Sequence, residues 1–272
     1  MAQTATFHYF PRNGQTSDDI TLVECLVNDG RTADLPGWQE CGFELQHLPS
    51  AVTDWEDDEE ISRVHYAELS EWAAGWTGCD TALVSGHIRR NPTQAEVHDD
   101  YAPIQFVHSD FADSYRERLT RFYTSGGAEA EQALKAGGIT AAQMAAAKRL
   151  VVIQTWRNVG PAKMDLPIAF CDARQIPRER LQAFNVPNYA DSGDPFDTLA
   201  ITEPSRDQAD PWFYFPEMTP DEAVVFRTYD SARIATDQPY WTPHSAFRDA
   251  EVHLGQPSRH SIELRATCLF FE

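Results

Sequence analysis

The chain has few basic residues. Lys and Arg together number 22 against 42 Asp and Glu, which gives a formal net charge of −20. Nucleic acids and anionic membrane surfaces select basic proteins, so this balance argues against both kinds of partner. Long apolar runs are also missing, because no stretch approaches the roughly eighteen apolar residues that a membrane-spanning helix needs. The first residues carry neither the basic nor the apolar region of a secretory signal. We therefore expect a soluble, cytoplasmic protein.

Cysteine is scarce and unpaired in its spacing. The chain has five cysteines, an odd number, and no Cys-x-x-Cys motif. This argues against a structural zinc site and against a disulfide framework of the kind found in secreted domains. Single cysteines in apolar runs usually behave as small buried hydrophobic residues. Internal repeats and low-complexity tracts are absent as well.

What the chain does contain is enough apolar residues for one large core, 42% hydrophobic and 11% aromatic. Period-2 runs predict strands over 20–27, 42–48, 81–90, 150–156, 167–172, 212–215, 223–229 and 262–271. Helical patterns fill much of 112–148, with Thr140 as a candidate N-cap, and we expect this insert to pack outside the sheet. Many short strands with peripheral helices favour a mainly β jelly roll that forms a single domain over residues 1–272.

One candidate metal site stands out in the run 104–110. Its alternation predicts a strand, on which residues i and i+2 point to the same face, so His108 and Asp110 would lie side by side. A second imidazole, for which His244 is the candidate, completes the two-histidine, one-carboxylate triad that binds ferrous iron on one face and leaves the other face open. Arg259 and Ser261 follow, on another strand-like run.

These residues occur in an order that resembles a known family. His-x-Asp, a distant His and an Arg-x-Ser are typical of iron(II)/2-oxoglutarate-dependent oxygenases. The blocks 152–157, 166–172, 212–216 and 243–247 are similar to the AsaB/CmcJ-like hydroxylase/desaturase group of secondary metabolism, over roughly residues 60–271. This group usually has Asn at the position of Gln154 and Pro at that of Asn158. The resemblance implies a cupin-like double-stranded β-helix with iron in its mouth.

The resemblance also implies what each residue does. Iron(II) is the cofactor, 2-oxoglutarate and O2 are cosubstrates, and the products are succinate, CO2 and an oxidised small molecule. Arg259 would meet the far carboxylate of 2-oxoglutarate with its planar guanidinium, helped by Ser261. Gln154 is a further candidate for cosubstrate binding. The candidates for contact with the small-molecule substrate are Arg157, Tyr101, Trp156, Tyr214 and Phe226.

Two other functions remain open at this point. A jelly roll can use the same triad with another metal for non-oxidative chemistry, although such chemistry needs no anchor for a dicarboxylate. A catalytically inactive jelly roll can serve as a binding protein, since a fold does not fix a function. The sequence leaves open the substrate, the choice among hydroxylation, desaturation and oxidative cyclisation, and the oligomeric state.

Overall fold

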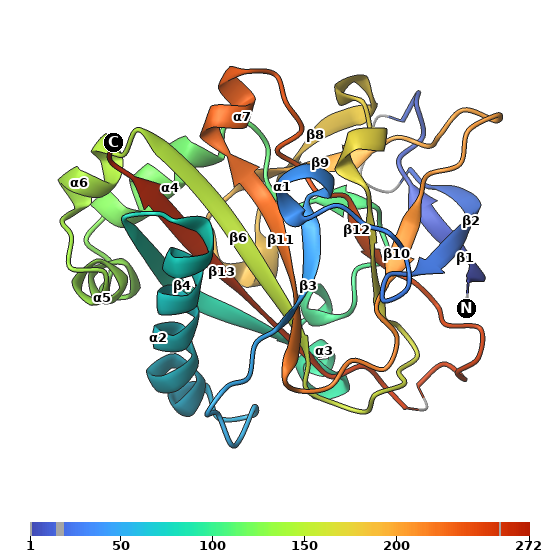
Figure 1. Ribbon diagram of the computed structural model, residues 1–272, viewed down its shortest axis with the longest axis horizontal. Helices are drawn as coiled ribbons and strands as arrows, with labels where there is room; N and C mark the ends of the chain where they lie inside the picture. Colours follow the sequence, from blue (N-terminus) through green and yellow to red (C-terminus); the bar gives the residue numbers. More distant parts are fainter. Residues whose placement is uncertain (1, 15–18, 256) are drawn as a thin grey trace.

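A computed structural model describes residues 2–14, 19–255 and 257–272 of the chain. Over this part of the chain, two β-sheets face each other and helices cover the ends and one face, so the predicted jelly roll is confirmed (Figure 1). That the whole chain, residues 1–272, is a single domain stays a prediction.

The larger sheet has the strand order β1-β2-β10-β7-β12-β5-β9-β8. Its strands are β1 (Gln3–Tyr9), β2 (Thr21–Asp29), β5 (His108–Ser109), β7 (Ile168–Cys171), β8 (Leu181–Val186), β9 (Phe196–Ile201), β10 (Trp212–Tyr214) and β12 (His244–Ala246). The second sheet has the order β3-β11-β6-β13-β4, all antiparallel. Its strands are β3 (Phe43–His47), β4 (Thr81–Arg90), β6 (Arg149–Asn158), β11 (Glu222–Asp230) and β13 (Ser261–Phe270).

The helices lie mostly before β5 and between β5 and β6. They are α1 (Trp38–Cys41), α2 (Asp58–Thr77), α3 (Pro92–Val97), α4 (Tyr115–Thr124), α5 (Ala128–Ala136), α6 (Ala141–Ala146) and α7 (Ser231–Ala235), with short 3-10 turns η1 (Asp99–Tyr101), η2 (Ala173–Gln175), η3 (Arg178–Arg180) and η4 (Tyr189–Asp191). Asp57 caps α2 by accepting from two backbone N–H groups. The predicted cap at Thr140 is confirmed, since Thr140 and Gln143 form a capping box.

The two faces of the five-stranded sheet pack against different parts of the molecule. Alternation along β6 sends Val151 and Ile153 to the face covered by α2, where they join a cluster with Ile61 and Leu69. Gln154 falls on the opposite face, which looks toward the eight-stranded sheet. Helix α2 therefore closes the outside of this sheet and leaves its inner face for a site.

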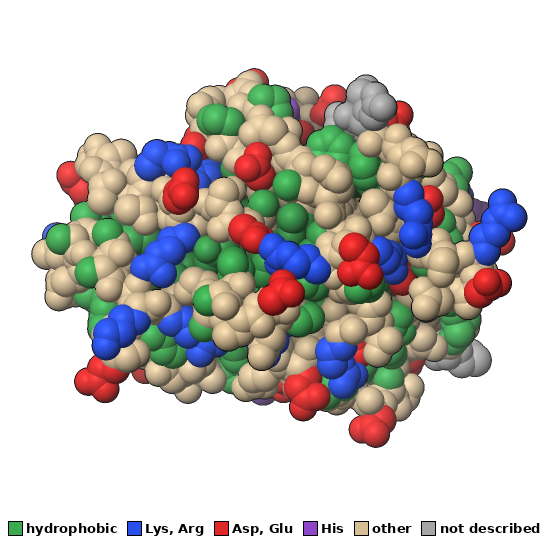
Figure 2. All heavy atoms as spheres, turned by 90° about the horizontal axis from the view of Figure 1, so that it is seen from above, with side chains coloured by type: hydrophobic (Ala, Val, Ile, Leu, Met, Phe, Trp, Pro, Cys, Tyr) green, Lys and Arg blue, Asp and Glu red, His purple; other side chains and the backbone are tan. Residues whose placement is uncertain are grey.

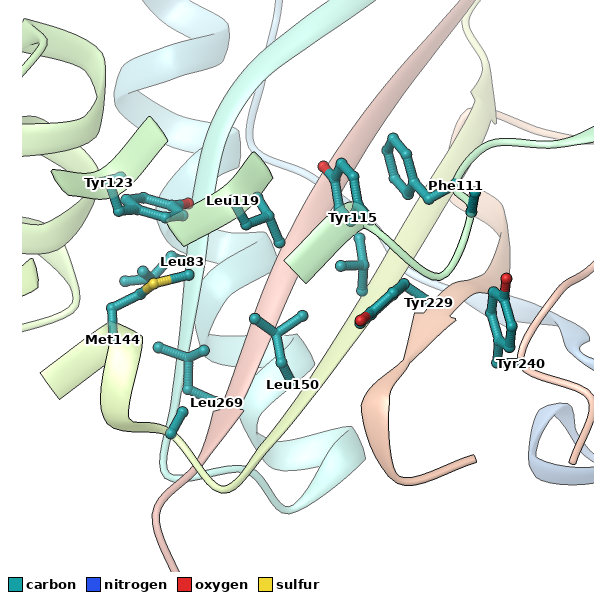
Figure 3. Close-up of a cluster of buried hydrophobic side chains, with 14 of the residues drawn as sticks. Leu83, Phe111, Tyr115, Leu119, Tyr123, Met144, Leu150, Tyr229, Tyr240 and Leu269 are labelled. Carbon is teal, nitrogen blue, oxygen red and sulfur yellow. The ribbon is translucent and has the colours of Figure 1, made fainter. Parts of the chain in front are cut away.

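The helical insert packs differently from our expectation. Side chains of α4 to α6, including Tyr115, Leu119 and Met144, contact Leu150 and Leu269 on the inner face of the five-stranded sheet (Figure 3). The expectation that this insert packs outside the sheet is therefore wrong. The apolar end of the inner face extends beyond the facing sheet, and these helices cover it, which closes one end of the space between the sheets.

The predicted strand over 104–110 is also much shorter than expected. Only His108 and Ser109 form strand β5, and Phe106 makes a single bridge to His8. Asp110 lies just beyond the strand. Ser109 pairs with Leu199 on β9. The next backbone hydrogen bond between these two segments runs from the Ala112 N–H to the Asp197 carbonyl, and it lies beyond Asp110. The side chains of His108 and Asp110 are nevertheless brought to one place, as the next subsection describes.

Polar clamps hold the eight-stranded sheet together. Asp210 accepts two hydrogen bonds from Arg180, at 2.6 and 2.8 Å, and a third from the Tyr9 hydroxyl at 2.6 Å. Trp212 donates in turn to the same hydroxyl at 2.8 Å. Both Arg180 and Asp210 are buried, so each charge depends on the other for compensation.

The surface carries acidic and basic side chains interspersed on the face drawn in Figure 2. Among the described helices, none combines the length and the apolar character needed to cross a bilayer. All five cysteines are buried and unpaired.

We predict that Asp210→Ala lowers the free energy of unfolding by about 3–5 kcal/mol, because it leaves the buried Arg180 without its counter-charge. Asp194→Ala is the matched control, since the Asp194 carboxylate is nearly half exposed where it pairs with Arg118. That change should cost no more than about 1 kcal/mol. Denaturant unfolding of both variants measures the difference, and equal losses would contradict the account of the clamp.

Candidate metal centre

Strand pairing brings the two candidate histidines together. His244 on β12 is the direct partner of His108 on β5, so both side chains leave the sheet on the same side. Their ring centroids are 4.4 Å apart. A further bond joins β5 to the segment just before β12, from the Thr242 N–H to the Ser109 hydroxyl at 3.2 Å. The register of two very short strands thus fixes the distance between the imidazoles.

Each imidazole is oriented by a backbone carbonyl. Nδ1 of His108 lies 2.7 Å from the Phe106 carbonyl oxygen, and Nδ1 of His244 lies 2.9 Å from that of Thr242. A carbonyl can only accept, so Nδ1 carries a proton in both rings, and in a neutral ring Nε2 then keeps its lone pair. Metal-binding histidines are typically held in this way. Both Nε2 atoms are therefore ready to bind a metal ion.

Asp110 completes the group. Its Oδ1 lies 3.7 Å from Nε2 of His108 and 3.6 Å from Nε2 of His244. One ligand atom from each residue lies within 4.8 Å of the others, a spacing at which a single ion can contact all three. Burial alone would raise the pKa of Asp110, but Arg265 and the two imidazoles outweigh it and hold that pKa well below its usual range.

The protonation of His108 fits the same use. Burial, and then the neighbouring His244, lower the pKa of His108 to about 4. The imidazole is therefore neutral near pH 7, which is the state that ligates a metal. The triad presents two imidazole nitrogens and one carboxylate oxygen.

The segment before His244 is held by a buried arginine. Arg227, fully buried on β11, donates to the carbonyls of Tyr240, Pro239, Trp38 and Gln39. Thr242 donates its hydroxyl to the Arg227 carbonyl at 2.6 Å and approaches Gly42 closely. Gly42 has φ 100°, and a Cβ there would collide with the Thr242 hydroxyl, so glycine is required. These contacts set the path of the chain into β12.

The inner face of the five-stranded sheet forms the wall opposite the triad. Phe226 on β11 lies 4.9 Å from the His244 ring, between centroids. Gln154 is its partner on β6 and Arg265 is the next partner on β13, so the three side chains share one face. Arg265 reaches Asp110, with Nη2 3.3 Å from Oδ2. This contact shows that the shared face is the one that looks at the triad.

Arg259 and Ser261 lie further along the same wall. The Arg259 Nε donates to the Ser261 hydroxyl at 2.8 Å, and its guanidinium carbon lies 5.0 Å from the centre of the Trp156 ring. Arg259 is 4% exposed, and among the described residues no carboxylate is within ion-pair distance of its guanidinium. Burial, and then the charge of Arg90, lower the pKa of Arg259 to about 9, so it is still a cation at neutral pH. A buried cation of this kind calls for an anionic ligand.

Several buried polar atoms on this wall lack a partner. Among the described residues these include Oε1 of Gln154, Nε1 of Trp156 and Nε of Arg265. Native interiors leave few such atoms unsatisfied, so a cluster of them indicates a polar ligand. A dicarboxylate held between the triad and Arg259 supplies acceptors for the N–H groups of Trp156 and Arg265 and a counter-charge for Arg259. The chemistry of the wall therefore fits 2-oxoglutarate, and that of the triad fits iron(II).

Buried Arg90 links the segments at the edge of the space between the triad and the facing wall. Arg90 on β4 pairs with Glu263 on β13 at 2.9 Å and donates to the Tyr189 hydroxyl at 2.9 Å. It also donates to the carbonyls of Asp100 and Ala102. The loop around Tyr189, which contains Ala190 at φ 47°, is thereby attached to the wall beside the triad.

Two of the predicted substrate residues line a cavity. Trp156 and Tyr214 border a hollow of about 160 Å³, together with Met164, Ile168, Phe215 and Val224. Its mouth carries Lys163, which lies 3.7 Å from both Glu217 and Glu251. Because Trp156 also contacts Arg259, the hollow lies next to the candidate cosubstrate anchor.

Of the other three predicted substrate residues, Phe226 lies beside His244, and Arg157 and Tyr101 lie elsewhere. Arg157 points to the α2 face of β6, where it donates to the carbonyls of Leu48 and Pro220 and stacks on Trp55. Parity along the strand puts it on the face opposite to Gln154, so the described contacts of Arg157 do not support the predicted contact with the substrate. Tyr101 is half-buried in η1 beside His98, and the described contacts do not connect it to the triad.

Arg265 is a residue of the site that the sequence motifs did not indicate. It lies four residues after Ser261 on the same strand and therefore on the same face. Continuing the alternation of the Arg-x-Ser motif to Glu263 and Arg265 is the signal that finds it.

Comparisons with known proteins agree with this geometry. A family described as oxidoreductase/YMDC permease-like domain matches residues 3–269. The alpha-ketoglutarate-dependent dioxygenase phiK of a fungal species is 23% identical over 266 residues, covering 93% of this chain and 86% of the relative. The hydroxylase/desaturase efuI of Hormonema carpetanum is 26% identical over 280 residues, covering 95% and 86%.

A solved structure shares the fold. The iron and alpha-ketoglutarate-dependent endoperoxidase NvfI superposes with a TM-score of 0.72 at 18% identity, over 99% of this chain and 98% of the other. The jelly roll is thus the same in both proteins. The family match covers nearly the whole length, and together with the named relatives it shows that the chain belongs to the AsaB/CmcJ-like hydroxylase/desaturase group of iron(II)/2-oxoglutarate-dependent oxygenases.

Proposed function

We propose that His108, Asp110 and His244 bind iron(II), and that the chain uses 2-oxoglutarate and O2 to oxidise a C–H bond of a small-molecule secondary metabolite. The observation that carries this proposal is the combination of a buried triad with a buried Arg259 on the facing wall, whose guanidinium has no carboxylate partner among the described residues. A non-oxidative metalloenzyme needs the triad but has no use for the second feature. A binding protein needs neither.

Each residue of the triad has a defined task. The two imidazoles offer Nε2 because backbone carbonyls hold the proton on Nδ1. Asp110 offers Oδ1, while its Oδ2 is occupied by Arg265. Three protein ligands leave three positions of an octahedral ion for other molecules. When bound there, iron(II) with 2-oxoglutarate and O2 supplies the oxidant for an unactivated C–H bond, and 2-oxoglutarate leaves as succinate and CO2.

The cosubstrate is anchored by charge and shape. Arg259 offers a planar guanidinium that a carboxylate meets through two parallel hydrogen bonds. Ser261 accepts from Nε and keeps its own O–H free to donate to the same carboxylate. Gln154 provides an unpartnered amide oxygen on the same wall, which suits a hydroxyl, a water molecule or a ligand N–H.

The substrate is proposed to lie beside Phe226, Trp156 and Tyr214. Phe226 packs on His244, and the other two line the hollow of about 160 Å³. A cavity of roughly 150 Å³ accommodates a benzene-sized group, so one ring or side chain of a small molecule fits there. The relative efuI is named a hydroxylase/desaturase. The reaction of this chain is accordingly proposed to be hydroxylation or desaturation, with oxidative cyclisation as a further reaction of the same kind. Buried, unpaired cysteines support a reducing, cytoplasmic setting.

We predict that His108→Ala and His244→Ala each abolish stoichiometric iron binding, because two remaining ligands hold iron far more weakly than three. Metal content after anaerobic loading and desalting measures the effect. His98→Ala is the control, since His98 is a partly exposed histidine outside the triad and should leave one iron per chain. Full iron occupancy in either triad variant would refute the assignment.

We predict that Arg259→Ala keeps iron but binds 2-oxoglutarate at least ~30-fold more weakly, because loss of a charged hydrogen-bond partner costs about 2–5 kcal/mol. Anaerobic calorimetry of the iron-loaded protein gives both affinities. Arg174→Ala, which removes a surface arginine paired with Asp172, is the control and should bind 2-oxoglutarate like the unchanged chain. Equal affinity in Arg259→Ala and the control would exclude Arg259 as the anchor.

A further inference from the structure

Asp110 is the least constrained of the three candidate ligands by its backbone. It lies outside strand β5, whereas both histidines lie in paired strands. A free carboxylate can bind an ion through one oxygen or through two. If both oxygens of Asp110 bound iron, one of the three positions left for 2-oxoglutarate and O2 would be lost. Something must therefore restrict this carboxylate to one oxygen.

Arg265 contacts the oxygen that faces away from the histidines. Oδ1 of Asp110 is the atom within 3.7 Å of both Nε2 atoms, whereas Oδ2 lies 3.3 Å from Nη2 of Arg265. The two oxygens thus have different partners. Among the described residues, Asp110 is the one carboxylate in ion-pair contact with Arg265, since the nearby Glu263 is paired with Arg90.

The aromatic side chain after Asp110 adds a second contact. The guanidinium carbon of Arg265 lies 5.4 Å from the centre of the Phe111 ring, and Phe111 stacks on Tyr115 at 3.4 Å between centroids. Arginine stacks well on aromatic faces through its planar cation. Arg265 therefore holds two consecutive residues, Asp110 by a hydrogen bond and Phe111 by stacking.

The pairing of β13, which carries Arg265, with its neighbour β4 is irregular at this point. The register between β13 and β4 shifts between Leu264 and Ala266, on either side of Arg265. Across from it, Gly86 on β4 has φ 71°. A β-bulge bends a strand and redirects a side chain, and such bulges are frequent next to active sites. The extra residue of this bulge lies on β4, where Ser85 and Gly86 oppose Arg265. Strand β13 keeps its regular register with β6, so Arg265 stays on the inner face with Gln154 and can reach Asp110.

We propose that Arg265 is a positioning residue, which holds Asp110 to one-oxygen ligation and so keeps the O2 position of the iron open. The proposal rests on the proposed function, since it assumes iron at the triad. It assigns Arg265 no contact with substrate. Its effect is expected on metal affinity and on access of a diatomic gas to the metal, and not on the anchoring of 2-oxoglutarate by Arg259.

The test compares Arg265→Gln and Arg265→Lys with the unchanged chain and with Arg174→Gln, which removes a surface arginine. Iron(II) affinity is measured anaerobically by chelator competition, and nitric oxide is then added with 2-oxoglutarate present, as a spectroscopic substitute for O2. The electron paramagnetic resonance signal of the iron–nitric oxide complex reports whether the position is open. A thermal melt shows that each variant is folded.

We expect Arg265→Gln to lower iron affinity by ~10–100-fold, as is usual for loss of a partner of a metal ligand, and to reduce the signal per bound iron. Arg265→Lys should recover part of both, because it restores a cation that can donate to Oδ2. A folded Arg265→Gln variant with unchanged iron affinity and an unchanged signal would overturn the proposal. If the unchanged chain itself binds no iron, the proposed function fails instead, so the two failures are distinguishable.

Discussion

The pairing of His108 with His244 is the constraint on which the site depends. Two strands of two and three residues set this register, and a shift by one residue would turn one imidazole to the far side of the sheet. Strands this short are not stable by their own hydrogen bonds. The Thr242–Ser109 bond, the close approach of Thr242 to Gly42 and the four carbonyls bound by Arg227 supply the missing support. Much of the surrounding structure thus fixes the distance between the imidazole rings of His108 and His244.

The arginines of the interior differ in how far the protein itself satisfies their charge and their N–H groups. Arg227 has four carbonyls, Arg180 has Asp210, and Arg90 has Glu263. Arg265 has the single bond to Asp110 and the ring of Phe111. Within the described residues, the Arg259 guanidinium donates only to the Ser261 hydroxyl and, at 3.3 Å, to the Leu166 carbonyl. Because a buried charge without a counter-charge is costly, its persistence marks the place where a ligand's charge belongs. Arg259 differs in this respect from Arg227 and Arg90, whose N–H groups bind carbonyls or a carboxylate of the chain.

The sequence predicts much of this, and the exceptions have physical reasons. Long alternating runs define β6, β11 and β13, and the motif order identifies His108, Asp110, His244 and Arg259 together. Strands of two or three residues carry no periodicity, so β5 and β12 are not predictable, and Asp110 falls outside the strand expected for it. The likeness of the block 152–157 to the family points to Gln154 and Arg157 alike, whereas parity puts them on opposite faces. Arg265 belongs to no motif, and only the regular alternation of β13 after Ser261 indicates that it shares the face of the site.

The central claim is that one iron and one 2-oxoglutarate bind together between the triad and the facing wall. Anaerobic titration of the purified chain with ferrous iron and 2-oxoglutarate tests this most directly, by following the weak visible charge-transfer band of cosubstrate chelated to iron. The account predicts a band that appears only when both are present and saturates at one equivalent of each. A folded protein that gives no band with both components at saturating concentration would contradict it.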